Sequence, residues 1–560
     1  MANLVNQVRS KLAEEIRSAI NEAITAGELD LKNVPEIMLE VPREEAHGDY
    51  ATNIAMVLAG QAKMAPRDIA QIIVDYLTEV DLISKVQIAG PGFINFYLSN
   101  EWLYEAVGLI LEQKESYGSS DFGQGEKVQV EFVSANPTGP LHVGHARGAV
   151  VGDVLGSIMA EVGFDVTKEY YINDAGNQMD LLGKSVALRY KELTGSEAEL
   201  PENAYHGEYI KDIAAEIFNV HGEKYLTTIE SGDYEYFREV AYEELLNNIK
   251  EDLLGFGIEF DNWFSERSLH QEGKINEVVE ELKNNDYIYE DEGALWFKAT
   301  EFGDDKDRVV IKDDGSPTYL AADVAYHNDK YERGFKEVIN VWGADHHGYI
   351  ERMKAIVEAL GYDREMLRVI IVQMVTLLRD GKQFSMSKRA GNFVTLKDVV
   401  EEVGRDAARY FYTMRNTDSH LDFDLELAKK ESTENPVYYI QYAHARICSI
   451  LDQLAEQEVT VANLSEVNLE QLDTDVELDL IQELVKYPDE LEKSAQSRAP
   501  HHMASYAHDL AARFHSFYNK CRVLIEDEEL MQARIQLLLA TKQVLLNLLK
   551  VLGISAPENM

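Results

Sequence analysis

Two histidines, His142 and His145, lie three residues apart in the segment Pro-Leu-His-Val-Gly-His. Imidazoles aimed at the same spot supply hydrogen-bond donors, and such donors can follow negative charge as it develops on a phosphoryl group. Gly144 between them leaves space for a flat ligand to approach the backbone. This spacing favours nucleotide chemistry, although one His-x-x-His pair is a weak signal because strand–turn–helix units are common.

The residues around the histidine pair predict a strand, a turn and a helix. Residues 128–133 are β-branched and aromatic, which is typical of a buried strand. Pro137, Gly139 and Pro140 cannot continue a strand ladder and therefore predict a turn. From Val143 small and apolar residues predict a helix packed on a sheet. The histidines would then lie at the helix start, where free backbone N–H groups and the helix dipole favour phosphate.

A second segment with possible chemistry, residues 376–391, follows about 240 residues after the histidines. Asp380-Gly381 predicts a tight turn between two strands. Ser387 and Lys388, followed by Ala390-Gly391, predict a loop that could place an ammonium group on phosphates. Taken alone, such a segment is more often an exposed basic loop.

Two further groups could recognise a ligand. Tyr319 and Asp323 are four residues apart, on one face of a predicted helix, and could present a phenol and a carboxylate together. A carboxylate is the geometric match for a planar guanidinium. The alternative is a helix-terminal aspartate beside a core tyrosine. His346 and His347 follow a predicted buried strand, but no cysteine or third ligand accompanies them, so we predict no metal site.

Composition limits the classes of function. The chain has 560 residues and a mass of 63.4 kDa, which predicts two to four domains. Cys448 and Cys521 are its only cysteines, so a disulfide framework and a four-cysteine zinc site are excluded, and a reducing cytosol is expected. No apolar run reaches the roughly 18 residues of a membrane span. The N-terminus is amphipathic and lacks a signal core.

The chain is strongly acidic. It carries 53 basic and 99 acidic residues, a net charge of −46 and a pI near 4.6. This balance argues against non-specific binding of nucleic acid, which normally needs a basic surface. It leaves room for a specific RNA partner, because a local basic stripe can exist on an acidic protein.

The pattern of elements predicts three domains. Residues 1–115 predict a small α/β domain, and the Gly- and Ser-rich segment 116–125 is the expected linker. Residues 116–396 alternate strands with helices, which predicts a Rossmann-like, doubly wound parallel sheet with a helical insertion at about 173–290. Residues 397–560 predict an all-α helical bundle.

The two chemical segments, taken together and in this order, resemble the HIGH and KMSKS signatures of class I aminoacyl-tRNA synthetases. The HIGH-like motif covers residues 135–145 and the KMSKS-like loop residues 385–389. In that class the histidines and the lysine stabilise pentavalent phosphorus while the amino-acid carboxylate attacks ATP. This chain departs from the pattern at Ser385, where the first lysine is expected, which leaves Lys388 in the lysine's role. A contribution from Arg389 is conjecture.

The resemblance narrows to arginyl-tRNA synthetases. The segments that carry it span residues 130–147, 171–178, 319–323, 510–523 and 553–560, so matches extend over nearly the whole chain. It implies an arginine–tRNA ligase, which activates L-arginine with ATP to arginyl-adenylate and transfers it to the 3′ end of tRNA(Arg), releasing AMP and pyrophosphate. It further implies that adenylate formation needs tRNA. The alternatives are a synthetase for another amino acid, a small-molecule nucleotidyltransferase and a non-enzymatic tRNA-binding relative.

The resemblance also implies site residues. The expected catalytic residues are His142, His145, Ser387 and Lys388. The expected ATP-binding residues are Pro137, Thr138, Gly139, Pro140, Leu141, His142, Val143, Gly144, His145, Gly343, Asp345, Met386 and Lys388. The expected arginine-binding residues are Glu131, Ser134, Asn136, Tyr319, Asp323 and His346. The expected tRNA contacts are Phe93, Asn95, Tyr442, Arg446 and Arg513, with Tyr438 and His444 as further candidates.

The resemblance also implies ligands and partners. ATP should arrive with Mg²⁺ as a substrate complex, and no tightly bound cofactor is expected. The expected partners are tRNA(Arg), L-arginine and ATP. The tRNA elbow would bind residues 1–115, and the tRNA stem and anticodon would bind residues 397–560. The protein is expected to be a cytoplasmic monomer without a membrane partner.

Overall fold

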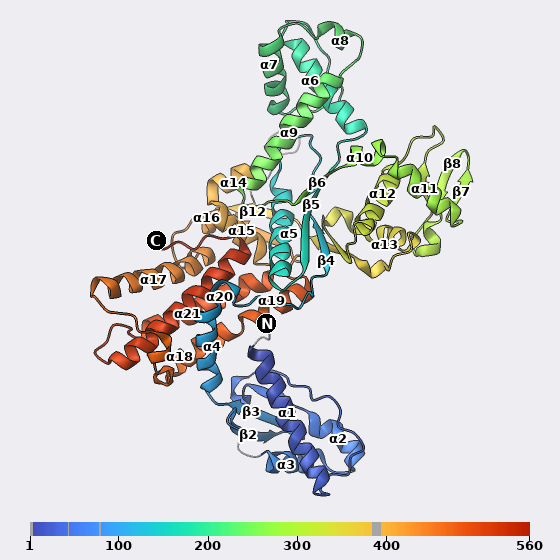
Figure 1. The fold of residues 1–560 in the computed structure, drawn as a ribbon. Coiled ribbons are helices and arrows are strands. Elements are labelled where there is room, and N and C mark those ends of the chain that lie inside the picture. Colours follow the sequence, from blue (N-terminus) through green and yellow to red (C-terminus); the bar gives the residue numbers. More distant parts are fainter. Residues whose placement is uncertain (1–3, 43, 78–79, 384–393) are drawn as a thin grey trace.

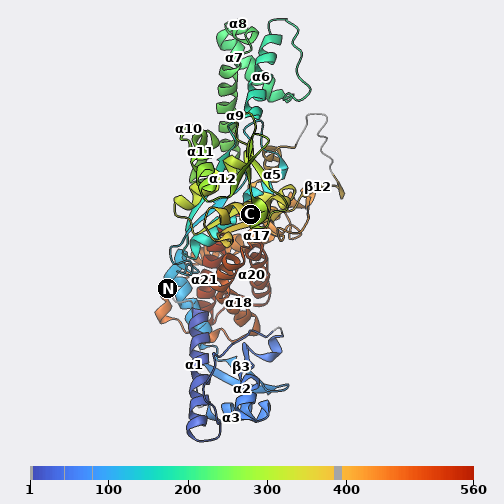
Figure 2. The same cartoon turned by 90° about the vertical axis from the view of Figure 1, so that its right-hand side faces the viewer.

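The computed structural model describes residues 4–42, 44–77, 80–383 and 394–560. Figures 1 and 2 show an elongated molecule, in which the N-terminal unit and a helical insertion lie at opposite ends and a central sheet lies between them. Each of these parts encloses apolar side chains of its own. The central sheet and the elements packed on it position the candidate active-site residues.

The N-terminal unit is a small antiparallel sheet covered by helices. Its sheet has the order β1-β3-β2, and Leu12, Ile16 and Ile20 of α1 are fully buried against it. The elements are α1 (Leu4–Thr25), β1 (Tyr50–Thr52), α2 (Ile54–Ala62), α3 (Pro66–Tyr76), β2 (Ile83–Ala89) and β3 (Phe93–Leu98).

Helix α4 (Glu101–Gln113) joins this unit to the C-terminal helices. It packs on α18 (Asp475–Val485) and α21 (Glu528–Leu552). Asn547 of α21 donates hydrogen bonds to the carbonyls of Lys114 and Tyr117, at 2.8 and 3.1 Å. The chain on both sides of residue 115 is therefore held by the C-terminal domain, whereas the expected domain boundary lies at that residue.

A five-stranded parallel sheet forms the centre of the molecule. Its order is β11-β10-β4-β5-β6, and the strands are β4 (Lys127–Glu131), β5 (Asp165–Ile172), β6 (Asn262–Ser265), β10 (Glu337–Gly343) and β11 (Leu367–Val372). The strand order reverses between β4 and β10, and ligands of such sheets bind at this switch point, beyond the carboxyl ends of the strands. The predicted Rossmann-like fold is confirmed.

The helical insertion is shorter than predicted. It comprises α6 (Asn177–Glu192), α7 (Glu208–His221), α8 (Leu226–Glu230) and α9 (Glu235–Gly255), and it projects from the body (Figure 1). The expected range 173–290 also contains β6, which belongs to the central sheet. That strand has four half-buried residues, Asn-Trp-Phe-Ser, so it lacks the apolar run that marks the other strands.

A second, antiparallel sheet lies beside the central one. Its order is β7-β8-β9, and the elements around it are α10 (Glu266–Gln271), α11 (Lys274–Asn284), β7 (Ile288–Asp291), β8 (Ala294–Phe297), β9 (Arg308–Ile311), α12 (Tyr319–Glu332) and α13 (Ile350–Ala359). Helix α12 begins at Tyr319, as predicted, and packs on α10, α11 and α13. It therefore carries Asp323 between the two sheets.

The C-terminal part is helical, as predicted, apart from one short strand. β14 (Leu421–Asp424) pairs in parallel with β12 (Val375–Arg379), which pairs with β13 (Lys382–Gln383). The helices are α14 (Leu396–Val403), α15 (Arg405–Thr413), α16 (Leu425–Ala428), α17 (Pro436–Glu456), α18, α19 (Tyr487–Ser497), α20 (His501–Lys520) and α21.

Helix α21 is long and apolar enough to cross a membrane by length and composition. However, 72% of its most apolar window is buried inside the protein. It packs on α4, α17 and α20, so its apolar residues form the core of the helical domain. Gly553 ends the helix in the left-handed conformation, with φ of 66°.

A buried arginine connects the helical domain to the sheet. Arg409 of α15 donates to the carbonyls of Leu552 at 3.1 Å and Phe256 at 3.2 Å, and it forms an ion pair with Asp153. Asp153 lies on α5 (Val143–Glu161) and also pairs with Lys168 of β5 at 2.6 Å. These bonds join the ends of α9 and α21 to α5, the helix that begins with the histidine motif.

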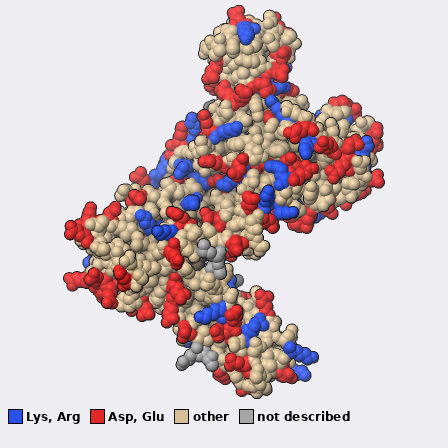
Figure 3. Space-filling model, in the orientation of Figure 1, with Lys and Arg blue, Asp and Glu red and all other residues tan. Residues whose placement is uncertain are grey.

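The surface matches the acidic composition. Figure 3 shows Asp and Glu side chains on every lobe of the visible face, with Lys and Arg side chains interspersed among them. On this face the basic side chains do not gather into one stripe.

Candidate active site

The chain after β4 is strained and tightly held. Val133 and Ser134 have positive φ angles of 68° and 42°, which are costly for residues with a β-carbon, above all for a branched one. The Ser134 hydroxyl donates to Glu131 at 2.9 Å and accepts from the backbone N–H of Tyr171 at 3.2 Å. These bonds hold Glu131 and Ser134 together at the carboxyl end of the central strand.

His142 and His145 begin α5 with their rings stacked, and the ring centroids are 3.8 Å apart. His142 is the N-cap residue, and its Nδ1 accepts from the backbone N–H of Gly144 at 3.1 Å. His145 Nδ1 accepts from the backbone N–H of His142 at 3.4 Å. Because Nδ1 is an acceptor in both rings, a neutral ring carries its proton on Nε2.

Burial, and then the neighbouring His142, lower the pKa of His145 to about 4. His145 is therefore a neutral ring near pH 7. The backbone N–H groups of Val143 and Gly144 already donate to Val394 and His142, so the donor that His145 offers to an anion is its own Nε2–H, without a full positive charge.

The chain that follows the KMSKS-like segment returns to the histidine motif. Val143 donates its N–H to the carbonyl of Val394 at 3.2 Å, and Leu396 donates to the carbonyl of Leu141 at 2.8 Å. Before the segment, Asp380 and Gly381 form the predicted tight turn between β12 and β13, with φ of 52° and 69°. The predicted residues Ser385, Met386, Ser387, Lys388 and Arg389 lie outside the described residues.

Three carboxyl groups, those of Asp323, Glu266 and Glu131, form what we call the acidic pocket, because the charges of the last two act on Asp323. Asp323 is half-buried, and burial, reinforced by the negative charges of Glu266 and Glu131, raises its pKa to about 7. Burial also raises the pKa of Glu266, although the Tyr171 hydroxyl and His270 partly offset this rise. A buried carboxyl group that resists ionisation beside two other carboxyls belongs to a site that a cation would stabilise.

Glu266 was not among the predicted residues. It follows directly after β6, at the same edge of the sheet as Glu131. Sequence periodicity does not predict that strand, so it does not predict that Glu266 lies at the edge of the sheet where ligands bind. Tyr319, one helical turn before Asp323, is 59% exposed.

A fully buried lysine holds the opposite side of the pocket. Lys330 forms an ion pair with Glu131 and donates to the Asn340 side-chain oxygen at 3.1 Å. The Asn340 amide contacts His327 Nε2 at 3.2 Å, and His327 Nδ1 contacts the backbone carbonyl of Asp323 at 2.9 Å. This chain of bonds joins β4, β10 and α12. Lys330 compensates the charge of Glu131, and His270 Nε2 lies 3.6 Å from the Glu266 carboxylate, so among the described residues Asp323 is the carboxyl of the pocket without an ion pair.

Burial and the neighbouring Lys330 lower the pKa of His327 to about 3. The ring is thus neutral and can donate from one nitrogen while it accepts at the other. His327 and Lys330 were not predicted, since each follows from contacts between elements far apart in the sequence.

The remaining predicted ligand residues lie around the same edge. The Asn136 amide donates to Gln178 of α6 at 2.6 Å. Gly343 ends β10, and Asp345 and His346 follow it as exposed residues, with 3.6 Å between the Asp345 carboxylate and His346 Nε2. They stand at the carboxyl end of the strand next to β4, on the other side of the switch point.

The predicted tRNA residues fall in two places. In the N-terminal sheet Phe93 is half-buried, while Asn95 is only 4% exposed. In the helical domain the Arg446 guanidinium lies over the rings of Tyr442 and Tyr518, 5.4 and 4.7 Å from their centroids.

Other candidates in the helical domain have partners within the protein. Arg513 pairs with Asp479 at 3.4 Å. His444 is buried, and its Nδ1 contacts the carbonyl of Pro557 at 2.9 Å. Half-buried Tyr438 stacks on Tyr442 with centroids 6.0 Å apart.

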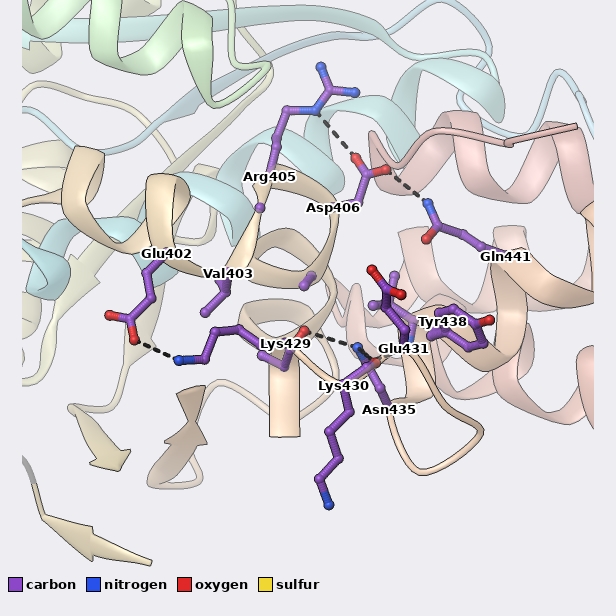
Figure 4. Close-up of a pocket in the computed structure, with 14 residues that line it drawn as sticks. Glu402, Val403, Arg405, Asp406, Lys429, Lys430, Glu431, Asn435, Tyr438 and Gln441 are labelled. Atoms are coloured by element: carbon purple, nitrogen blue, oxygen red, sulfur yellow. Dashed lines mark hydrogen bonds and ion pairs between the residues drawn. The ribbon is translucent and has the colours of Figure 1, made fainter. Parts of the chain in front are cut away.

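A cavity of about 520 Å³ lies between α14 and α15 on one side and α16 and α17 on the other (Figure 4). Its cations are already paired: Lys429 with Glu402 at 3.0 Å, and Arg405 with Asp406 at 3.3 Å. Asp406 also accepts from Gln441 at 2.8 Å, which joins α15 to α17. This network makes the cavity part of a helix junction, and the histidine motif with the acidic pocket remains the better candidate site.

Comparisons with known proteins agree with this geometry. Residues 106–448 match the model for tRNA synthetases class I (R), catalytic domain. Residues 10–98 match the arginyl tRNA synthetase N terminal domain, and residues 440–560 match the DALR anticodon binding domain. The fold and the histidine motif thus define a class I aminoacyl-tRNA synthetase.

Individual relatives narrow the class. An arginine–tRNA ligase of Desulforamulus reducens is 50% identical over the full length of both chains. A Campylobacter jejuni crystal structure described as an arginyl-tRNA synthetase is 40% identical, has a TM-score of 0.76 and is covered completely by 83% of this chain. The Thermus thermophilus arginyl-tRNA synthetase shares the fold, with a TM-score of 0.72 at 22% identity over 99% of this chain and all of that chain. The chain belongs to the arginyl-tRNA synthetase family, and the predicted family and ligase activity are confirmed.

Proposed function

We propose that ATP binds at the start of α5 and that the guanidinium of L-arginine binds in the acidic pocket, so that both substrates meet at the carboxyl end of β4. The observation that carries this proposal is the raised pKa of Asp323, which follows from burial and from the charges of Glu266 and Glu131, together with the two histidines at the start of α5, whose Nε2 atoms can donate. Arginine provides a cation for Asp323, in a planar shape that matches carboxylates.

In this proposal the turn from Pro137 to Pro140 and the first turn of α5 hold the phosphates. Gly343 and Asp345 face the ribose, and Met386 and Lys388 approach from the KMSKS-like loop. Mg²⁺ arrives with ATP, because this ion keeps phosphate and water ligands. His142 and His145 donate from Nε2 to oxygens of the α-phosphate as the pentavalent centre forms.

The amino-acid pocket holds arginine at both ends. Asp323 and Glu266 bind the guanidinium, and Tyr319 packs beside it. The strand-end groups, Glu131, Ser134 and Asn136, together with His346 form the wall toward the amino and carboxylate groups of the substrate. Lys330 keeps Glu131 in place there.

The reaction then needs no protein nucleophile. The arginine carboxylate attacks the α-phosphorus, and the bond to pyrophosphate breaks. A hydroxyl of the tRNA 3′ end next attacks the carbonyl of the adenylate, and AMP leaves. Catalysis comes from positioning and from electrostatic stabilisation of the transition state.

For tRNA(Arg) we propose stacking contacts at the two ends of the molecule. Arg446 between Tyr442 and Tyr518 provides a cation and two ring faces of the kind that unpaired bases stack on. Phe93 and Asn95 are proposed at the tRNA elbow, and Arg513 on the anticodon side. The enzyme acts as a cytoplasmic monomer without a membrane partner.

The raised pKa of Asp323 predicts a pH-dependent KM for arginine. The ionised carboxylate binds the guanidinium, which stays charged at every pH used. Since the pKa in the free enzyme is about 7, protonation competes with arginine below that pH. KM for arginine should be nearly constant above pH 7.5 and should rise about tenfold between pH 8 and pH 6. Initial rates of ATP–pyrophosphate exchange, measured with tRNA present, give this value.

The variant Asp323→Asn is the control for this experiment. It keeps the size of the side chain but cannot titrate, so its KM for arginine should be high at every pH and should lose the rise below pH 7. A wild-type KM that is flat from pH 6 to pH 8, or an equal slope in Asp323→Asn, would exclude Asp323 from the guanidinium site.

A further inference from the structure

The helical insertion is bonded directly to the turn that precedes the histidine motif. Tyr209, at the start of α7, donates its hydroxyl to the carbonyl of Thr138 at 2.8 Å. Gln178, at the start of α6, accepts from the Asn136 amide at 2.6 Å. Two separate helices of the insertion therefore bond to Asn136 and Thr138, two positions apart in the chain.

The backbone packs closely around the Tyr209 side chain at two glycines. A β-carbon on Gly139 would come within 2.9 Å of the Tyr209 hydroxyl oxygen, and one on Gly207 within 2.1 Å of the ring. Glycine at both positions makes room for the tyrosine. Burial raises the pKa of Tyr209 to about 12, so the hydroxyl remains a hydrogen-bond donor throughout the physiological range.

The base of the insertion is tied to the other half of the site. Asp174 is 2% exposed and accepts from the Ser265 hydroxyl at 2.6 Å and from the Arg267 backbone N–H at 3.0 Å. These two residues flank Glu266. Tyr242 of α9 donates to the same Asp174 carboxylate at 3.0 Å.

The rest of the insertion is largely independent of the sheet. Its outer part has a hydrophobic cluster of its own, which includes Leu182 of α6, Ile213 of α7 and Phe237 of α9. Its connections to the turn and to the residues around Glu266 lie at its base.

We propose that Tyr209 and Gln178 are positioning residues of the adenylation site, which bond to Thr138 and Asn136 and so hold the turn from Pro137 to Pro140 where the phosphates of ATP are proposed to bind. The helical insertion is then part of the active site, although its side chains do not react. This inference rests on the proposed ATP role of the turn.

The test is the variant Tyr209→Phe, which keeps the ring between the two glycines and removes only the hydroxyl. In ATP–pyrophosphate exchange with arginine and tRNA, we expect KM for ATP to rise about five-fold, the size of one lost hydrogen bond. KM for arginine should stay unchanged. The double variant Asn136→Ala/Gln178→Ala should be no worse for ATP than Asn136→Ala alone, because the two side chains form one interaction.

The matched control is Tyr236→Phe. Tyr236 lies in the same insertion, and its hydroxyl contacts His221 Nε2 at 2.9 Å instead of the turn. We expect wild-type KM values for both substrates. All variants are compared by thermal unfolding, so that a loss of folding is separated from a loss of positioning.

These measurements separate a failure of the proposed function from a failure of this inference. A wild-type enzyme that shows no exchange with arginine would overturn the proposed function together with this inference. Wild-type exchange with an unchanged KM for ATP in Tyr209→Phe would overturn the inference alone. An equal rise in both KM values with a lowered Tm would also overturn it, because the bond would then support only the fold.

Discussion

Replacing Asp323 with alanine is expected to raise KM for arginine by roughly 30-fold or more while KM for ATP changes by less than about two-fold. Truncating one partner of a buried, hydrogen-bonded charge pair costs about 2–5 kcal/mol, and each 1.4 kcal/mol is about a tenfold change in affinity. The charge of Glu266 acts on Asp323 in the acidic pocket, and ATP is proposed to bind at the start of α5, on other residues. Exchange rates over a range of each substrate separate the two effects.

The control for this variant is Glu332→Ala. Glu332 lies on the same helix α12, where it pairs with Lys274 at 3.0 Å on the surface, and its loss should leave both KM values unchanged. An unchanged KM for arginine in Asp323→Ala would remove this carboxylate from the guanidinium site. A similar rise for ATP would indicate that the variant disturbs the whole site.

Replacing His145 with alanine should lower kcat for adenylate formation by about 100- to 1,000-fold, the usual cost of one preorganised donor to a developing anion. His145 is neutral near pH 7 and carries its proton on Nε2, so it acts as a donor without titrating in that range. KM values should change much less, because the bond strengthens only in the transition state. Single-turnover measurement of adenylate formation gives the rate directly.

The conservative variant His145→Gln separates chemistry from packing. Its side-chain amide can still donate near the position of Nε2, so we expect a rate between those of wild type and His145→Ala. If His145→Ala and His145→Gln both kept kcat within about three-fold of wild type, transition-state stabilisation by His145 would be ruled out.

Local sequence signals predicted the parts of the site that local geometry determines. Two prolines and Gly139 are sufficient to end a strand, and the histidines follow at the start of the next helix. Asp380-Gly381 forms the expected turn for a similarly local reason. Family resemblance supplied Tyr319 and Asp323, whose spacing on α12 then placed them one helical turn apart.

The residues that sequence could not predict depend on long-range contacts. Glu266 reaches the pocket only because β6, a short half-buried strand, joins the sheet edge. A lysine on a helix is usually exposed, and Lys330 is fully buried because it pairs with Glu131 and donates to Asn340, residues of two strands far away in the sequence. Tyr209 lies 71 residues from Thr138. Sequence periodicity carries no information on contacts between residues so far apart in the chain.

The central claim is that this site activates arginine with ATP. The most direct measurement is ATP–pyrophosphate exchange with each of the twenty amino acids, with and without tRNA(Arg). We expect exchange with arginine in the presence of tRNA, and none above background with the other amino acids. Exchange with a different amino acid would contradict the assignment of the pocket, and the absence of exchange with every amino acid, even with tRNA(Arg) present, would contradict the account of the site as a whole.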